Sequence, residues 1–171
     1  MQLGAFSISL AVSDIGKSRG FYTALGFETV GGDEQQGWLI LRNGDHTIGL
    51  FQGMFESNLM TFNPGWDRQG NALDDFTDIR DILAQLASAG IEIDSATIES
   101  DSGPASFSVT DPDGNVILFD QHVCRHGCSK TQVSVNQCLW QAVKVHQGIS
   151  IMCSRQTRDA DQSLSYNAAT G

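Results

Sequence analysis

The chain opens with strict alternation of apolar and polar residues over 6–12, which is typical of a strand with one buried face. The predicted core-facing side chains are Phe6, Ile8, Leu10 and Val12, and the predicted opposite face carries Ser7, Ser9 and Ala11. Helical spacing follows at once. An amphipathic helix is predicted to start at Ser13 or Asp14, to bury Ile15, Ser18, Tyr22 and Leu25, and to end at Gly26.

A second helix with the same register is predicted from Thr77 or Asp78 to Gly90. Its apolar stripe consists of Ile79, Ile82, Leu83 and Leu86. Asp14-Ile15 and Gly26-Phe27 recur as Asp78-Ile79 and Gly90-Ile91, both at an offset of 64 residues. This spacing favours two duplicated supersecondary units, and the alternative is chance agreement between two capped helices.

Strands are predicted around both helices. After the first helix they are 27–30, 37–42 and 47–52, and after the second helix they are 91–98, 106–110 and 116–121. The segment 59–63 is predicted to open the second unit, and turns at 43–45 and 111–115 close the last hairpin of each unit. The order is therefore β-α-β-β-β twice, within one domain of residues 1–122 whose modules cover roughly 1–56 and 57–122.

Several short motifs add a family likeness. They are Ser7–Asp14, Phe21-Tyr22, Leu25-Gly26-Phe27 and the turn Asp111-Pro112-Asp113-Gly114-Asn115 before an apolar strand. With them the chain resembles the vicinal-oxygen-chelate superfamily, which includes glyoxalases, bleomycin resistance proteins and extradiol dioxygenases. The segment 59–67 is similar to an uncharacterised bacterial branch of it. The resemblance implies an α+β fold in which two βαβββ modules form a curved mixed-sheet cleft, and it implies a homodimer.

Metal-dependent members of that superfamily hold one divalent ion with four residues, and the resemblance implies where these would fall. The positions are Ser7, Gly49 or its neighbour, the strand 59–63 and Leu118, and the best donor that strand offers is Asn63. This set lacks the His and Glu ligands of such sites. We therefore expect no cofactor and no metal site. A divalent metal enters only under the alternative of a glyoxalase-like lyase or dioxygenase with non-standard ligands.

Without a metal, the cleft offers aromatic walls and a few polar groups, which is what a small-molecule pocket needs. The candidate ligand-binding residues are Ser7, Ser9, Trp38, Phe51, Gln52, Asn63, Trp66, Phe107, Asp120 and His122. Each aromatic among them is open to the alternative that it is an ordinary core residue. No catalytic residue is assigned.

The charge distribution changes the picture at residue 123. Residues 1–122 hold 18 acidic residues and five Lys or Arg, which gives them a net charge of −13. The whole chain has a net charge of −10, so residues 123–171 carry +3. All four cysteines also lie beyond residue 122. Residues 123–171 are therefore expected to form an atypical, poorly ordered extension, either a frameshifted or fused segment or a genuine accessory one.

Four potential zinc ligands alternate at the start of this extension. They are His122, Cys124, His126 and Cys128. Alternate residues of an extended segment lie ~6.5–7 Å apart, which is too far for four to reach one ion without a bend. We therefore predict no zinc site there.

The acidic balance argues against a nucleic-acid partner and suits a cationic ligand. The absence of a signal-like N-terminus or a membrane-length apolar run makes the cytoplasm the expected location. The leading hypothesis is a small-molecule-binding protein, possessing the fold but not the metal ligands, that sequesters its ligand. Missing metal ligands, an acidic surface and exposed tryptophans favour this hypothesis over the metal-dependent alternative. A third hypothesis is a structural relic that binds no ligand.

Overall fold

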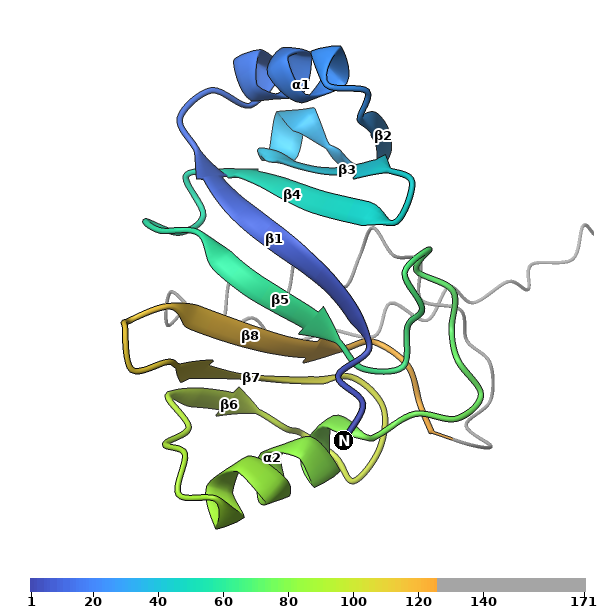
Figure 1. The fold of residues 1–171 in the computed structure, drawn as a ribbon, viewed down its shortest axis with the longest axis vertical. Coiled ribbons are helices and arrows are strands. Elements are labelled where there is room, and N and C mark those ends of the chain that lie inside the picture. The colour runs from blue at the N-terminus through green and yellow to red at the C-terminus, as the bar shows by residue number, and fades with distance from the viewer. Residues whose placement is uncertain (126–171) are drawn as a thin grey trace, which may run out of the picture.

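A computed structural model describes residues 1–125 of the chain (Figure 1). The predicted extension therefore lies, beyond Arg125, outside the described residues. The described elements are β1 Ala5–Val12, α1 Ile15–Ala24, β2 Glu28–Asp33, a 3₁₀ turn Glu34–Gln36, β3 Trp38–Asn43, β4 His46–Gln52, β5 Leu59–Asn63, α2 Ile79–Ser88, β6 Ser95–Thr97, β7 Ala105–Thr110 and β8 Val116–Gln121.

All eight strands belong to one mixed sheet in the order β2-β3-β4-β1-β5-β8-β7-β6. In each module the first strand pairs parallel with the last, β1 with β4 and β5 with β8. The modules meet where β1 runs antiparallel to β5, with Ser7 opposite Thr61. The sheet is open, and the predicted α+β fold of two βαβββ modules is confirmed.

The two helices begin as predicted, each at an aspartate. The Asp14 carboxylate accepts a hydrogen bond from the Lys17 amide at 2.9 Å, and Asp78 accepts one from the Arg80 amide at 3.0 Å. Gly26 and Gly90 follow the helices at φ 87° and 78°, in the left-handed region that a helix terminator needs.

The repeat extends to a contact that ties each helix to the last strand of its module. Gln52 Oε1 accepts a hydrogen bond from the Ile15 amide, and Gln121 Oε1 accepts one from the Ile79 amide, both at 2.8 Å. In each module a glutamine at the end of the strand therefore binds the first amide of the helix. This shared contact supports duplication over chance.

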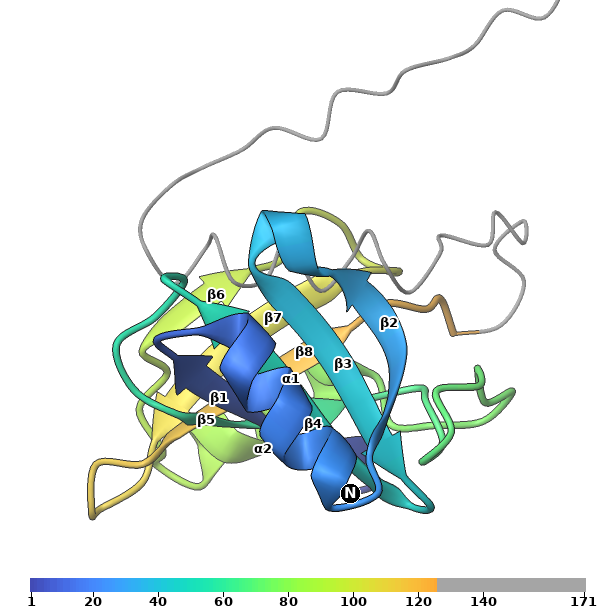
Figure 2. The ribbon, with the colours of Figure 1, turned by 90° about the horizontal axis from the view of Figure 1, so that it is seen from above.

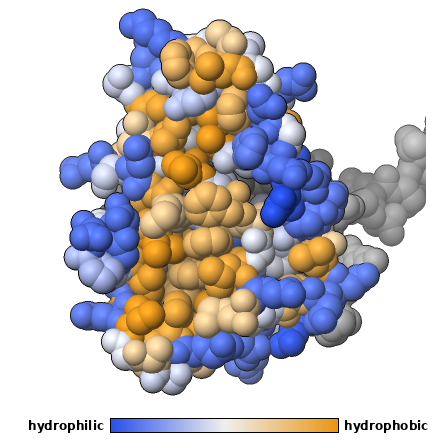
Figure 3. All heavy atoms as spheres, viewed as in Figure 1, coloured by the Kyte–Doolittle hydropathy of each residue, from blue (hydrophilic) through white to orange (hydrophobic). Residues whose placement is uncertain are grey.

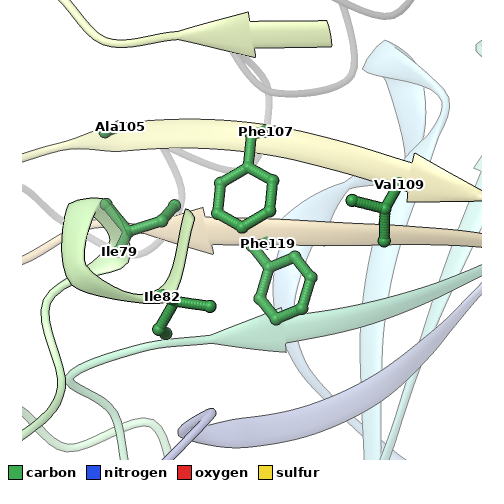
Figure 4. Close-up of a cluster of buried hydrophobic side chains, with 6 residues drawn as sticks. All are labelled: Ile79, Ile82, Ala105, Phe107, Val109 and Phe119. Carbon is green, nitrogen blue, oxygen red and sulfur yellow. The ribbon is translucent and has the colours of Figure 1, made fainter. Parts of the chain in front are cut away.

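Each helix covers the outer strands of its own module. Ile79 and Ile82 of α2 pack on Phe107, Val109 and Phe119 of β7 and β8 (Figure 4). Ile15 of α1 belongs to a second cluster, which includes the buried side chains Leu39, Leu41 and Leu50. Figure 2 shows α1 lying over its own half of the sheet.

This arrangement corrects part of the predicted core. Phe6 and Ile8 face the helix side as predicted, but they are 46% and 39% exposed because neither helix reaches the central strands β1 and β5. Leu25, the residue that caps the C-terminal end of α1, is 57% exposed. The strand predicted over 91–98 is reduced to β6, three residues long.

Candidate functional site

The cleft face is the face of the sheet opposite the two helices. The strand registers place Ser7 and Ser9 of β1 on this face, beside Thr61 of β5 and Gly49 of β4. Ser9 Oγ and Thr61 Oγ1 are 3.1 Å apart in a buried hydrogen bond. This central hydroxyl pair joins the two modules at the middle of the face.

A cluster of polar residues and one aromatic lies beside this pair on the second module. Asp120 and His122 alternate along β8 and just beyond it, so both project from the cleft face, with Asp120 Oδ2 3.1 Å from His122 Nε2. Trp66 stacks on the imidazole with ring centroids 4.4 Å apart. Asn63 donates from Nδ2 to the backbone oxygen of Asp120 at 2.9 Å. We call Asn63, Trp66, Asp120 and His122 the acid–histidine cluster.

Every member of the acid–histidine cluster is buried, with exposures from 5% to 9%. Asp120 Oδ2 is close to His122 Nε2, at 3.1 Å, but no contact with a described residue has the geometry of a hydrogen bond. A shielded carboxylate attracts cations and hydrogen-bond donors strongly, because little water screens it. The cluster is therefore suited to a ligand with a positive or N–H-bearing group.

The loop after β5 places Trp66 against the histidine. Gly65 adopts φ 86°, and a Cβ atom built there would lie 2.2 Å from Val123 Cγ2. Trp66 then bridges to Ala72, and the Asp67 carboxylate binds the Asn71 backbone and side-chain amides at 2.8 and 3.0 Å. These hydrogen bonds from Asn71 hold the pKa of Asp67 below its ordinary value.

The same loop chemistry occurs at the turn before β8. Asp111 accepts hydrogen bonds from the Asn115 backbone and side chain at 2.8 and 2.7 Å, and the side-chain bond leads the effects that lower the Asp111 pKa. Both loops have the pattern Asp-x-x-Gly-Asn. Sequence reasoning identified only the second, although the repeated pattern was available to reveal the first.

A separate, apolar cluster occupies the cleft face of the first module. Trp38 pairs with Phe51 across β3 and β4, and both are buried together with Ile40. The Phe51 ring covers Gly49, where an added Cβ would lie 2.4 Å from Phe51 Cε2. Phe55 packs on Phe51 with ring centroids 5.1 Å apart.

The structure does not bring this apolar cluster to the acid–histidine cluster. Four strand-to-strand steps separate β3 from β8, or roughly 19 Å across a flat sheet at ~4.8 Å per step. Trp38 also lies opposite the end of β1 at Ala11, whereas Asn63 lies opposite its start at Ala5. The apolar cluster and the acid–histidine cluster therefore occupy different parts of the cleft face.

Two predicted site residues lie on the helix side of the sheet. Phe107 is 1% exposed and stacks on Phe119 under α2, with ring centroids 4.6 Å apart. The pattern Ala105-Phe107-Val109 of β7 belongs to the core, so Ser106 and Ser108 occupy its cleft face instead. Gln52 binds the start of α1 through its side-chain oxygen.

Sequence reasoning also missed two hydroxyl residues and misjudged the tryptophans. Thr61 and Ser106 are buried on the cleft face, Ser106 directly opposite Asp120. Their signal was the short polar residue at alternate strand positions. Trp38 and Trp66 are 2% and 8% exposed, not exposed as expected, because Phe51 and His122 pack against them.

The positions that the resemblance assigns to a metal do come together. Ser7 pairs with Thr61, Thr61 with Leu118, and Gly49 lies opposite Ser9. These side chains offer hydroxyls, a hydrogen and an alkyl group, which do not fit a divalent ion that requires imidazole or carboxylate ligands. Over residues 1–125 no group of three or more His, Cys, Asp and Glu side chains is placed to hold a metal.

A further hollow lies away from the cleft face. It has a volume of about 440 Å³ and lies between α1 and the end of β1, lined in part by Leu10, Val12, Phe21 and Asn58. Among the described residues no helix is long and apolar enough to span a bilayer, α1 and α2 having ten residues each.

The fold is that of a paired βαβββ protein with a cleft face opposite its two helices. The family model of the Glyoxalase/Bleomycin resistance protein/Dioxygenase superfamily matches residues 4–119. The chain belongs to this superfamily. No curated protein matches the chain.

Solved structures are similar to the chain at low sequence identity. A structure described as NAD-dependent benzaldehyde dehydrogenase from Legionella pneumophila has TM-score 0.51 and 15% identity, covering 68% of this chain and 98% of that one. A superfamily member from Vibrio splendidus 12B01 has TM-score 0.48 and 20% identity, covering 68% and 97%. The Mn(II)-bound glyoxalase from Novosphingobium aromaticivorans has TM-score 0.47 and 15% identity, covering 77% and 44%.

Proposed function

We propose that this protein binds a small cationic organic molecule directly through side chains of its cleft face, without a metal ion, and so sequesters it. The observation that carries the proposal is the Asp120 carboxylate. It is 5% exposed, and its Oδ2 lies 3.1 Å from His122 Nε2 without meeting the geometry of a hydrogen bond to any described residue. An ammonium or amidinium group would supply both a charge and a donor to this oxygen.

The residues around Asp120 would complete the recognition of such a molecule. Trp66 stacks on the imidazole of His122, which lies 3.1 Å from the carboxylate, and aromatic faces attract cations. Asn63 fixes the backbone at Asp120, and Ser106 lies opposite it on β7. The net charge of −10 adds a long-range attraction for a cation.

A three-probe titration tests this proposal. Benzylamine, benzyl alcohol and benzoate share an aromatic ring and differ in charge, and binding to the full chain is followed by calorimetry. We expect benzylamine to bind at least about tenfold more tightly than benzyl alcohol, because a hydrogen bond to a charged group contributes about 1.5–3 kcal/mol. Benzoate should bind least tightly of the three.

Substitution of the carboxylate identifies the site. Asp120→Asn should abolish the preference for benzylamine, while Asp113→Asn, which removes a carboxylate from an exposed turn, should preserve it. Equal binding of benzylamine and benzoate would contradict the proposal, as would an unchanged preference in Asp120→Asn. The cytoplasmic location and the homodimer remain predictions that accompany it.

A further inference from the structure

The central strands of the sheet present an apolar surface on the helix side that neither helix covers. Figure 3 shows hydrophobic side chains gathered in a band over β1 and β5, between α1 and α2. Phe6 and Ile8 are 46% and 39% exposed there. An exposed apolar surface of this extent is typical of a place where another molecule binds. We call its residues the central strip, and they are Phe6, Ile8, Leu10, Met60 and Phe62.

The hollow of about 440 Å³ opens at one end of the central strip. It forms because β1 pairs with β5 only as far as Ser9, whereas its pairing with β4 continues to Val12. Beyond Ser9 the Asn58 side chain, and not a strand, binds the Ala11 amide, at 3.0 Å. Leu10 belongs both to the strip and to the lining of the hollow, so the two apolar surfaces are continuous.

The lining of the hollow has a charge opposite to that of the whole chain. Its aromatic wall is Phe21 and Tyr22 of α1, whose rings meet edge to face with centroids 5.2 Å apart. Among the described residues, Lys17 is the only charged one that lines the hollow. Lys17 Nζ lies 3.2 Å from Asp14 Oδ2, with the two side chains 87% and 46% exposed. Such an exposed ion pair is weak, so a ligand anion can replace Asp14 as the partner of Lys17.

We propose that the hollow and the central strip together bind a linear aliphatic carboxylate, that is, a fatty acid. The ligand carboxylate binds Lys17, and the first methylene groups lie in the hollow between Phe21 and Leu10. The rest of the hydrocarbon chain follows β1 over Ile8 towards Phe6. Since β1 rises ~3.3 Å per residue, the row from Leu10 to Phe6 spans ~13 Å, a length suited to an extended chain.

The charges of the molecule make an anion a specific expectation. A net charge of −10 repels anions in general, so a carboxylate binds only where a local cation and a large apolar contact offset that repulsion. Lys17 supplies the cation, and the hollow with the strip supplies the apolar contact.

This site is separate from the acid–histidine cluster. Leu10 and Val12 pack with Ile15 of α1, and Phe62 packs against the cluster beneath α2, so the strip lies on the helix side of the sheet. Asp120 lies on the cleft face. The fatty-acid site therefore does not depend on the cationic ligand proposed above, and Asp120→Asn should leave its affinity unchanged.

Calorimetric titration of the full chain with octanoate and with laurate, each below the concentration at which it forms micelles, tests the site. Laurate has four more methylene groups than octanoate. We expect laurate to bind at least about tenfold more tightly, because these groups lie on the strip and are partly removed from water. Absence of laurate binding, which would result if residues 126–171 or a second copy of the chain cover the strip, would overturn the proposal.

A matched pair of charge variants tests the role of Lys17. Lys17→Gln should lower the affinity for both acids about fivefold, the effect of losing one exposed ion pair. Arg68→Gln removes a cation that is also exposed and paired, with Asp45, but does not line the hollow, so it should leave both affinities unchanged. Equal effects of the two variants would overturn the assignment of the carboxylate to Lys17.

A matched pair of apolar variants tests the strip. Ile8 and Ile98 are both 39% exposed, and only Ile8 belongs to the strip. Ile8→Ser should lower the affinity for laurate about fivefold and leave that for octanoate unchanged, because octanoate lies within the hollow. Ile98→Ser should change neither affinity. Retained octanoate binding shows at the same time that the Ile8→Ser protein is folded.

A further variant avoids any change at the centre of a strand. Phe21 is 62% exposed, so Phe21→Ser removes one wall of the hollow with little effect on the core. It should lower the affinity for both acids about fivefold. Laurate binding that withstands both Ile8→Ser and Phe21→Ser would overturn the proposed site.

Discussion

Replacing Gln121 with leucine is expected to destabilise the fold by about 3 kcal/mol, far more than the equivalent replacement of Gln52 in the other module. Gln121 is fully buried. Its Oε1 accepts from the Ile79 amide at 2.8 Å, and its Nε2 donates to Asp78 Oδ2 at 3.0 Å. The same nitrogen donates to the backbone oxygens of Gly103 at 3.2 Å and Val123 at 3.0 Å.

The magnitude follows from what leucine leaves behind. A buried group that loses its partner costs about 1–3 kcal/mol, and here a helix amide, a carboxylate and two carbonyl groups lose one. Arg80 still binds Asp78 Oδ1 at 2.9 Å, so the carboxylate retains one partner. The other three groups, at the lower value of about 1 kcal/mol each, give a total of ~3 kcal/mol. Gln52 is exposed and loses one hydrogen bond that water can replace, so its loss is at most about 1 kcal/mol.

Urea unfolding of the full chain and of both variants measures the difference. With a slope near ~2 kcal/mol per M, Gln121→Leu should lower the midpoint by about 1.5 M and Gln52→Leu by about 0.5 M or less. An unchanged slope would show that the denatured state is the same in all three. Equal losses in the two variants would refute the reasoning that burial of the contact sets its energy.

Two further predictions concern the acidic range and the loop that holds Trp66. Burial is the largest effect on the Asp78 pKa and raises it, but hydrogen bonds from Gln121 and Arg80 together outweigh burial and lower the pKa below 3.8. Stability from this group is therefore present above pH 3.8 and should be lost as the pH falls through the folded pKa, and Asp78→Asn should flatten urea midpoints measured across that range. Gly65→Ala should lower the thermal midpoint by about 10 °C and perturb the near-ultraviolet signal of Trp66, because its Cβ would overlap Val123. Gly44→Ala, also at positive φ but with no atom within 4 Å, should lower the midpoint by only about 4 °C, and equal effects would contradict the overlap.

The order of elements was predictable because local signals set it. Aspartates begin both helices, glycines at positive φ end them, and the Asp111–Asn115 turn closes the last hairpin, all within a few residues of sequence. Helix starts agree with the prediction for this reason. The shortened β6 is the exception, since its length depends on pairing with β7.

The candidate site was less predictable because it depends on which strands become neighbours. The sequence predicts both Trp38 and Asp120 as cleft residues. Only the strand order shows that they lie on strands far apart in the sheet. The exposure of Phe6 and Ile8 depends on how far each helix reaches across the sheet. Phe107 could have been assigned to the core from the sequence, because Ala105, Phe107 and Val109 form one apolar face of their strand.

Native mass spectrometry of the full chain, purified after growth with zinc, nickel, manganese and iron supplied, tests the central claim that ligands bind this cleft face without a metal. Asp120→Ala and His122→Ala are measured beside the wild type, so that metal held elsewhere on the chain is distinguished from metal at the acid–histidine cluster. The account predicts that neither variant changes the metal content, and that any organic molecule carried by the wild type is lost from Asp120→Ala. One divalent ion per wild-type chain that disappears in both variants would contradict it.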